Sequence, residues 1–365
     1  MFYSNITFIC PCYNHEKYLL EFLGSLVKQT NCNWELIIID DCSSDKSVDV
    51  INSVKDRRIT FIKNSFNRGI NANVSRGILQ AKTELISFVA SDDVLYPDYV
   101  ETVLSVFNDA PDVDVCYTPL QHINENGALI NSVTTLPYSF SEHQILEKMF
   151  LDENLLPSPG MAFKKRVFTP YLPLDFGIIQ YSDYQMHFFV LLDHKIKMLE
   201  SPLVLYRVTQ NSTSSRSKAV LLREKIETEK LMNSFVRLVG DNLLLFNKIF
   251  SHNKTIVGNK VTNETILYWL GRIALLSSNK NKQEWGLSVI MNYISNDKNV
   301  RLLHELYGFS YKEYLKMADF VVSRSTLSED EIKIKKYKSR IKKLQFSFVS
   351  FIITSLFLFI YILLV

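Results

Sequence analysis

Short apolar runs alternate with amphipathic stretches over the first 120 residues of the chain. The apolar runs are rich in Ile, Val and aromatic residues, which is typical of buried strands. They are Ile6–Cys10, Trp34–Asp40, Ile59–Lys63, Leu85–Ala90 and Val113–Tyr117. The stretches with helical spacing are Glu16–Gln29, Lys46–Val54, Asn71–Lys82 and Pro97–Asn108. Repeated strand–helix units predict an α/β fold with a central, mostly parallel sheet that helices cover on both faces.

Polar residues follow the predicted strands, at the edge where parallel sheets bind ligands. They are Pro11 to Glu16, Asp40 to Asp45, Asn67-Arg68-Gly69 and Ser91-Asp92-Asp93. Two acidic pairs thus meet at one edge, and Mn²⁺ or Mg²⁺ typically binds through one or two carboxylates together with substrate phosphates. The pattern favours a metal–diphosphate ligand. Asp41 and Asp45 can alternatively cap the next helix, whereas one Asp would suffice as a cap at Asp92-Asp93.

Composition excludes several classes of protein. The 365 residues exceed one ordinary domain, and 47% hydrophobic with 22% charged residues excludes a mainly disordered chain. The net charge is +3, but residues 331–343 alone carry +6, so the rest of the chain sums to −3. A nucleic-acid binder would carry positive charge on the fold itself. The five cysteines are odd in number and lack a CxxC pair, which indicates reduced thiols in a cytosolic compartment.

The C-terminal segment is strongly apolar. Residues 346–365 contain no charged residue, and a helix of this length would span about 30 Å, the thickness of a bilayer core. Residues 331–345 are basic, which places them on the cytoplasmic side under the positive-inside rule. The N-terminus shows no cleavable signal. We therefore expect a single C-terminal pass in the inner or plasma membrane with a cytoplasmic catalytic domain; a buried core helix is the alternative.

Four motifs together resemble family-2 glycosyltransferases. They are Pro11-x-Tyr13-Asn14, Ile39-Asp40-Asp41-x-Ser43-x-Asp45, Asn67-x-Gly69 with Arg76, and Ser91-Asp92-Asp93. Each motif is weak alone, but their order and spacing across about ninety residues are those of the family. The resemblance implies a GT-A fold and transfer of a sugar from a nucleotide-diphospho-sugar. Ala90 stands where many relatives carry a further Asp.

The resemblance also implies roles for individual residues. Asp40 would hydrogen-bond the base, most often uracil, while Asp92 would approach the ribose and Asp93 would bind the divalent metal. The implied nucleotide-sugar-binding residues are Pro11, Tyr13, Asn14, Asp40, Asp41, Asn67, Arg68, Gly69, Arg76 and Asp92.

The family resemblance continues more weakly to about residue 215. Residues 156–166 resemble the segment that backs the donor sugar, and residues 205–212 resemble a loop that closes over the diphosphate, with Thr209 where relatives often carry His. Asp183 lies where relatives have the general base, although Ser182 replaces the commoner Glu. An inverting transfer needs one base beside the acceptor hydroxyl and a Lewis acid beside the leaving group. A helix N-cap is the alternative role for Asp183, and His187 and His194 are interpreted as packing or surface residues.

These observations predict four regions. Residues 1–217 form the GT-A domain, with 1–120 as the nucleotide-binding half and 121–217 as the acceptor-side half. A helical region (218–330) with helices at Leu221–Leu238, Glu264–Leu276 and Glu284–Ile294, a basic juxtamembrane segment (331–345) and a transmembrane anchor (346–365) follow.

The function predicted is a membrane-anchored, metal-dependent inverting glycosyltransferase. Its expected donor is a UDP-linked nucleotide-diphospho-sugar, and its expected acceptor is a lipid-linked oligosaccharide or a growing surface polysaccharide. A non-catalytic nucleotide-sugar-binding component of a polysaccharide assembly complex is one alternative. A nucleotidyltransferase is another, but it should carry a Gly-rich, basic loop after the first strand, where this chain has Pro11 to Asn14.

Overall fold

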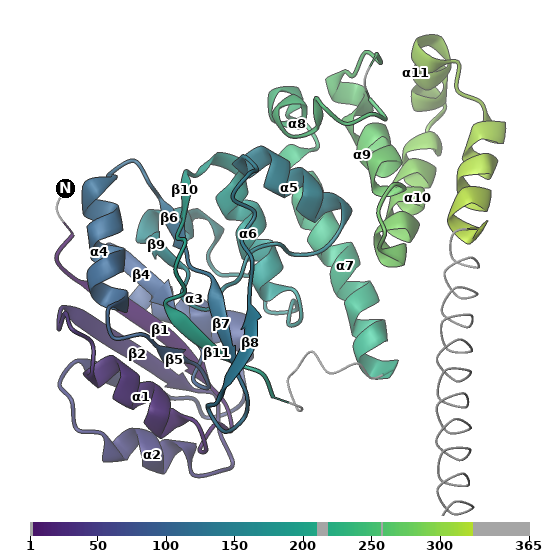
Figure 1. Cartoon of the computed structure of the whole chain (residues 1–365). Helices are drawn as coiled ribbons and strands as arrows, with labels where there is room; N and C mark the ends of the chain where they lie inside the picture. The colour runs from purple at the N-terminus through teal and green to yellow at the C-terminus, as the bar shows by residue number, and fades with distance from the viewer. Residues whose placement is uncertain (1–2, 210–217, 257, 324–365) are drawn as a thin grey trace, which may run out of the picture. The chain divides into compact units, whose positions relative to one another are not determined.

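The computed structural model describes residues 3–209, 218–256 and 258–323 (Figure 1). The chain divides after Gly286 into two compact units. All residues of the predicted site belong to the first unit. The predicted region boundaries at 217/218 and 330/331 remain predictions.

A seven-stranded sheet forms the centre of the first unit. Its strands, in spatial order, are β10 (Ile196–Met198), β6 (Val115–Tyr117), β9 (Ala162–Lys164), β4 (Leu85–Phe88), β1 (Ile6–Cys12), β2 (Trp34–Asp40) and β3 (Ile59–Lys63). Neighbouring strands run parallel except where β9 lies antiparallel between β4 and β6. The predicted α/β fold is confirmed, and the inserted β9 makes its sheet mixed.

Helices cover both faces of this sheet, which explains why its central strands are continuously apolar. The four helices of the nucleotide-binding half are α1 (Leu19–Val27), α2 (Ser47–Ser53), α3 (Ile70–Gln80) and α4 (Tyr99–Asp109). On one face Phe8 of β1 packs against Tyr99 of α4, with ring centroids 5.5 Å apart. On the other face α3 approaches so closely that a Cβ on Gly77 would lie 2.5 Å from Ile9 Cγ2.

A second, four-stranded sheet was not predicted from the sequence. Its order is β5 (Val94–Leu95), β11 (Val204–Arg207), β7 (Leu120–Ile123) and β8 (Leu129–Val133). Strand β11 pairs antiparallel with β5 and parallel with β7. Since β5 directly follows Asp92-Asp93, this pairing brings residues from near position 207 to the acidic pair.

The rest of the described chain is mainly helical, in agreement with the predicted helical C-terminal region. The helices are α5 (Glu142–Leu151), α6 (Ser182–Asp193), α7 (Lys218–Val239), α8 (Leu243–Phe250), α9 (Ile266–Ala274), α10 (Lys280–Ile294) and α11 (Asp297–Tyr307). Three short 3₁₀ turns are η1 (Lys165–Val167), η2 (Thr169–Tyr171) and η3 (Asn263–Thr265). Phe150 of α5 packs on Phe235 of α7 and Phe250 of α8, with centroids 4.8 and 5.2 Å away. This aromatic cluster joins α7 and α8 to the acceptor-side half.

No helix within the described ranges is long and apolar enough to cross a membrane. The basic segment 331–345 and the predicted anchor 346–365 lie outside those ranges.

Candidate functional site

The loops after β1 and β2 hold each other at the predicted nucleotide edge. Asn14 adopts a left-handed conformation (φ 55°), and its Oδ1 accepts a hydrogen bond from Ser44 N at 2.8 Å. Ser43 Oγ accepts in turn from Asn14 N at 2.9 Å. Tyr13 beside them is 48% exposed, so its ring is accessible to a planar base.

Asp40 and Asp41 have different environments although they are adjacent. Asp40 is fully buried; its Oδ2 accepts from Ser43 N at 3.1 Å, whereas Oδ1 has no hydrogen-bond partner among the described residues. A buried acceptor without a donor is costly, and the N–H of a nucleobase would satisfy it. The geometry of Asp40 therefore fits the predicted contact with the base.

Asp41 instead organises the loop before α3. It accepts from Arg68 N at 2.8 Å, Gly69 N at 2.9 Å and Asn64 Nδ2 at 2.9 Å. Burial acts to raise the pKa of Asp41, but these hydrogen bonds outweigh it and lower the pKa below its ordinary value. The alternative role of Asp41 as a cap for the next helix is wrong, because α2 has no side-chain cap at its N-terminus.

Asp45 fastens the start of α2 to the first loop. Its Oδ1 accepts from Ser47 N at 2.9 Å, and its Oδ2 accepts from Glu16 N at 3.0 Å. The N-cap position of α2 is Lys46, so the alternative role of Asp45 as the helix cap is wrong, although Asp45 binds the first backbone amide of the helix from the position before the cap.

The two arginines assigned to the nucleotide differ in accessibility. Arg76 donates from Nη1 to Asn64 Oδ1 at 2.9 Å, and Asn64 in turn contacts Asp41. Arg68 is exposed, and its guanidinium lies 5.8 Å from the ring centroid of Phe66. Arg68, next to the exposed Asn67, is thus free to meet an anionic ligand, whereas Arg76 supports the loop.

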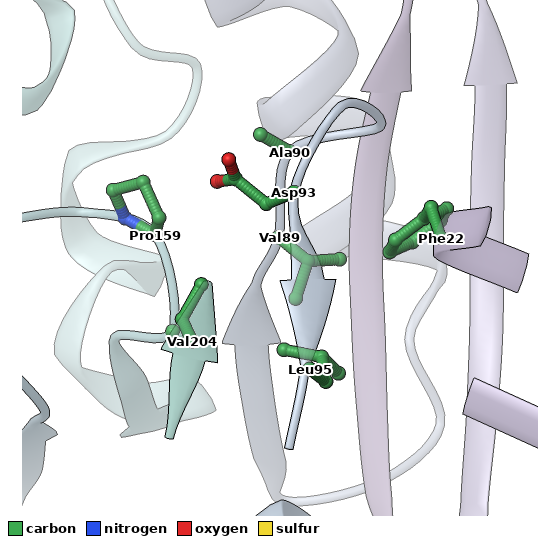
Figure 2. Close-up of a pocket in the computed structure, with 8 residues that line it drawn as sticks. Phe22, Val89, Ala90, Asp93, Leu95, Pro159 and Val204 are labelled. Carbon is green, nitrogen blue, oxygen red and sulfur yellow. The ribbon is translucent and has the colours of Figure 1, made fainter. Parts of the chain in front are cut away.

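The second acidic pair presents one unsatisfied carboxylate oxygen. Asp93 is 2% exposed; its Oδ1 accepts from Arg207 N at 2.9 Å, and its Oδ2 has no partner among the described residues. Figure 2 shows the carboxylate pointing away from Phe22 and towards Pro159. Burial first, and the charge of Asp92 second, raise the pKa of Asp93 well above its ordinary value. A divalent cation would offset both effects.

The neighbouring Asp92 is more accessible. Its side chain is 23% exposed, and its Oδ1 lies 4.0 Å from His15 Nδ1, which also contacts Ser91 Oγ at 2.7 Å. In the described ranges no group of three or more His, Cys, Asp and Glu side chains could hold a metal. A metal at Asp93 would therefore need diphosphate oxygens as further ligands, as Mg²⁺-type sites commonly do.

Arg207 holds Asp92 and Asp93, which we call the acidic corner, in place. It is 3% exposed, and its guanidinium donates to Glu21 Oε2 at 2.6 Å, Asp92 O at 2.8 Å and Asn124 O at 3.1 Å. Because these protein groups occupy its donors, the Arg207 guanidinium has a structural role and is not available to bind a diphosphate. Within the predicted closing loop 205–212, residues 210–212 lie outside the described ranges.

Asp183 lies in the first turn of α6. Its Oδ2 accepts from Asn154 Nδ2 at 3.1 Å, and its Oδ1 accepts from Tyr184 N at 2.7 Å. Burial raises the pKa of Asp183 to about 6, against the lowering effect of these two bonds. The alternative role as a helix N-cap is wrong, because Tyr181 holds the N-cap position and no side chain caps the helix there. A carboxylate with this pKa is ionised at pH 7 and is a stronger base than an ordinary aspartate.

Asn154, which the sequence did not indicate, orients Asp183, and His187 in turn contacts Asn154. Asn154 Oδ1 accepts from Leu156 N at 3.2 Å and lies 3.0 Å from His187 Nδ1. Burial lowers the pKa of His187 to about 3, so the ring is neutral. Asn154 Nδ2 donates to Asp183, so the atom that faces His187 Nδ1 is Asn154 Oδ1. An amide oxygen can only accept a hydrogen bond, and the proton of the neutral His187 ring is therefore on Nδ1. The buried packing role predicted for His187 is thus confirmed, with an orienting role added; His194 lies partly exposed, 3.3 Å from Asp114 Oδ2.

Tyr206 lies on β11 beside Arg207, whose backbone N contacts the acidic pair. Burial raises its pKa, and the charges of Asp93, Asp92 and Asp183 raise it further. Contacts link the predicted base to the acidic pair: Asp183 accepts from Asn154, Asn154 faces His187, and His187 Nε2 lies 3.4 Å from Ser158 Oγ. The segment predicted to back the donor sugar also lies here, since Pro159 and Gly160 line the same recess as Asp93. Gly160 (φ 73°) leaves no room for a Cβ, which would lie 2.5 Å from Val204 Cγ2.

Comparisons with known proteins agree with this geometry. Residues 7–168 match the model of "Glycosyl transferase family 2". An uncharacterized glycosyltransferase of Methanocaldococcus jannaschii is 28% identical over 208 residues, which cover 56% of this chain and 70% of that protein. Glycosyltransferase GlyA of Streptococcus pneumoniae is 27% identical over 314 residues, 83% of this chain but 42% of GlyA. The Escherichia coli enzyme WfgD, a UDP-Glc:alpha-D-GlcNAc-diphosphoundecaprenol beta-1,3-glucosyltransferase, is 25% identical over 223 residues, 60% of this chain and 83% of WfgD.

Solved structures share the fold. Staphylococcus aureus TarS (residues 1–349) in complex with UDP-GlcNAc superposes with a TM-score of 0.54 at 16% identity, covering 83% of this chain and 91% of that chain. The mannosyltransferase PcManGT from Pyrobaculum calidifontis, in complex with GDP-Man and Mn²⁺, gives 0.50 at 12% identity, with 88% and 86% covered. The order of strands, the acidic pair after β4 and the match over residues 7–168 lead to one conclusion: residues 7–168 belong to a family-2 glycosyltransferase domain, and the protein is a glycosyltransferase that uses a nucleotide-sugar donor.

Proposed function

We propose that this glycosyltransferase transfers a sugar from a UDP-linked donor with inversion, using Asp183 as the general base. The observation that carries the proposal is the series of contacts from Asp183 through Asn154 and His187 to Ser158, which directly precedes the residues that line the recess of Asp93. A base and a leaving-group site at one point of the fold are what in-line displacement needs. The UDP-GlcNAc bound by TarS and the UDP-Glc named for WfgD support a uridine nucleotide.

On the donor side, the chain's own residues bind and orient the nucleotide. Asp40 accepts from the base through its unsatisfied Oδ1, and Tyr13 offers an exposed ring beside it. A divalent cation held by Asp93 Oδ2 would neutralise charge on the diphosphate as it leaves. Arg207 holds Asp92 and Asp93 in place through its backbone N and its guanidinium.

On the acceptor side, Asp183 Oδ2 is oriented by Asn154 and takes the proton of the attacking hydroxyl. The hydroxyl oxygen then attacks the anomeric carbon from the face opposite the diphosphate, which inverts the configuration. Burial supports this role because it raises the pKa of Asp183 to about 6, close to the pH at which the proton must be accepted.

We further propose that the acceptor is a lipid-linked oligosaccharide or a growing surface polysaccharide, and that residues 346–365 anchor the enzyme in the membrane. Twenty residues without charge, preceded by a basic segment, support the anchor. The diphosphoundecaprenol acceptor named for WfgD supports a lipid-linked substrate. An anchored enzyme would meet such an acceptor on the same surface.

A screen of nucleotide-sugars with the full-length protein tests this proposal. Release of UDP from one UDP-sugar, stimulated by membrane lipid extract, is expected, and NMR of the product should show the anomeric configuration opposite to that of the donor. A product with retained configuration would reject the inverting mechanism. Turnover only with a donor carrying another base would reject the uridine assignment.

A further inference from the structure

A buried carboxylate on α7 holds the chain segment that leads to Asp183. Glu227 is 2% exposed, and its Oε2 accepts from three consecutive backbone amides: Ile179 N at 3.0 Å, Gln180 N at 2.6 Å and Tyr181 N at 3.0 Å. The helix that carries Asp183 starts at the next residue. Hydrogen bonds to an ionised acceptor are roughly twice as strong as neutral ones. One carboxylate of α7 therefore holds the backbone of residues 179–181, just before the predicted base, through three hydrogen bonds.

Two more charged side chains on the same face of α7 contact this segment. We call residues 175–181 the α6 entry loop. Arg223 donates from Nη2 to Gln180 Oε1 at 2.9 Å, and Lys230 donates from Nζ to Asp175 Oδ1 at 3.2 Å. Arg223 and Lys230 lie one turn before and one turn after the buried glutamate, so all three residues share one helix face. Helix α7 therefore contacts both ends of the α6 entry loop. It is the first helix of the region for which the sequence predicted no chemical role.

Helix α3 of the nucleotide-binding half holds the other side of the α6 entry loop. Asn71 donates from Nδ2 to Asp175 O at 2.7 Å and to Ile178 O at 3.1 Å. Ser75 Oγ accepts from Leu174 N at 3.0 Å. These bonds involve only neutral groups. Of the hydrogen bonds that α3 and α7 make to this loop, those that involve a charged side chain of the helix come from α7.

We propose that Glu227 is a positioning residue for catalysis: it fixes residues 179–181 so that Asp183 points at the acceptor hydroxyl. The inference rests on the proposed role of Asp183 as the base. A displacement of about 1 Å in the reacting geometry can cost on the order of 100-fold in rate. Burying a carboxylate costs folding free energy unless hydrogen-bond donors compensate for the lost water. Here the three backbone amides of residues 179–181 are those donors. Helix α7 would then be part of the catalytic machinery and not only a packing element.

The substitution Glu227→Gln tests this directly. The glutamine side chain has nearly the same size, but its single oxygen is uncharged and accepts more weakly from the three backbone amides. Its NH₂ group would replace the oxygen that now lies 3.6 Å from Arg223 Nε. We expect kcat to fall on the order of 10-fold to 100-fold, while KM for the UDP-sugar changes by less than about twofold. Glu229→Gln makes the same chemical change at an exposed position of α7 and should leave both constants at the parent value. An unchanged kcat in Glu227→Gln would overturn the inference.

A double-mutant cycle with Asp183→Asn separates positioning from general damage. If Glu227 acts through Asp183, adding Glu227→Gln to Asp183→Asn should lower the residual rate by less than about twofold, because coupled residues are not additive. An equal fold-loss in both backgrounds would overturn the inference. A parent-like rate in Asp183→Asn alone would instead reject the proposed function. If Glu227→Gln does not fold, Glu227→Asp keeps the charge one methylene shorter: reduced kcat at unchanged donor KM supports positioning, and a parent-like kcat rejects it.

Discussion

Asn154 and Asp183 form a donor–acceptor pair in which only one amide orientation is possible, because Asn154 Oδ1 already faces His187 Nδ1 and Leu156 N. The 3.1 Å bond favours the ionised form of the predicted base and lowers its pKa.

Asn154→Ala should therefore shift the acidic limb of the kcat–pH profile to higher pH. Loss of the donor leaves burial unopposed at Oδ2, so the pKa of Asp183 rises from about 6 and the base is protonated over a wider range. Steady-state kinetics between pH 5 and 8 measures the shift. Asn292→Ala, on an exposed position of α10, is the matched control. A limb that stays in place or moves to lower pH would contradict the geometry.

Asp183→Asn should lose activity and gain stability at the same time. A positioned general base contributes about 10²- to 10⁴-fold to turnover. Burial raises the pKa of Asp183 to about 6, so the charged form opposes folding above that pH, and the penalty fades as pH falls towards the unfolded value of about 3.9.

The melting temperature of Asp183→Asn should thus exceed that of the parent at pH 7, by more than it does at pH 5. Calorimetry at both pH values tests the sign. A variant that melts lower at pH 7 would mean that Asp183 is structural.

Asp93→Asn should weaken metal use without unfolding the domain. The amide oxygen can still accept from Arg207 N, whereas the unsatisfied Oδ2 loses its charge. We expect EDTA to stop transfer by the parent, Mn²⁺ to restore it, and the variant to need far more Mn²⁺ or to stay inactive. Calorimetric titration of Mn²⁺ with UDP gives a readout that does not depend on turnover. Asp98→Asn, exposed at the start of α4, serves as control; full parent activity in excess EDTA would reject the metal site.

Full-length protein should fractionate with membranes and resist high salt. An apolar helix of residues 346–365 would satisfy its backbone within lipid, and each basic residue of 331–345 adds about 1 kcal/mol near an anionic surface, a contribution that salt screens. Detergent should release the protein, and deletion of residues 331–365 should leave it in the supernatant with donor hydrolysis retained. Release of full-length protein by salt alone would mean peripheral binding.

The strands of the nucleotide-binding half were predictable because each is a short run rich in Ile, Val and aromatic residues, and β1, β2 and β4 are buried along almost their whole length. Trp34–Asp40 and Ile59–Lys63 match β2 and β3 at both ends. The run Leu85–Ala90 overestimated β4, which ends at Phe88 because the chain turns there: Asp93 N donates to Ala90 O. The second sheet gave no such signal, since β8 is only partly buried and β11 pairs with β7 more than eighty residues away.

Part of the site had a local signature and part did not. Acidic residues at or near the end of an apolar run, such as Asp40 and Asp93, can be recognised from the order of residues. Asn154, His187 and Tyr206 stand alone in the sequence, and their importance lies in what folding places beside them. The same holds for Glu227. Its neighbours in sequence are charged residues typical of an exposed helix face, and its role follows only from its three amide partners in the folded chain.

The bond from Arg207 N to Asp93 Oδ1 has a consequence for how the enzyme is made. The two residues are separated by 114 positions, so a ribosome that has released the first four strands has produced a carboxylate with nothing to orient it. Only after β11 emerges and pairs with β5 and β7 does Asp93 acquire its fixed direction. The carboxylate of Asp93 therefore cannot acquire this partner until residue 207 of the 365 has been made.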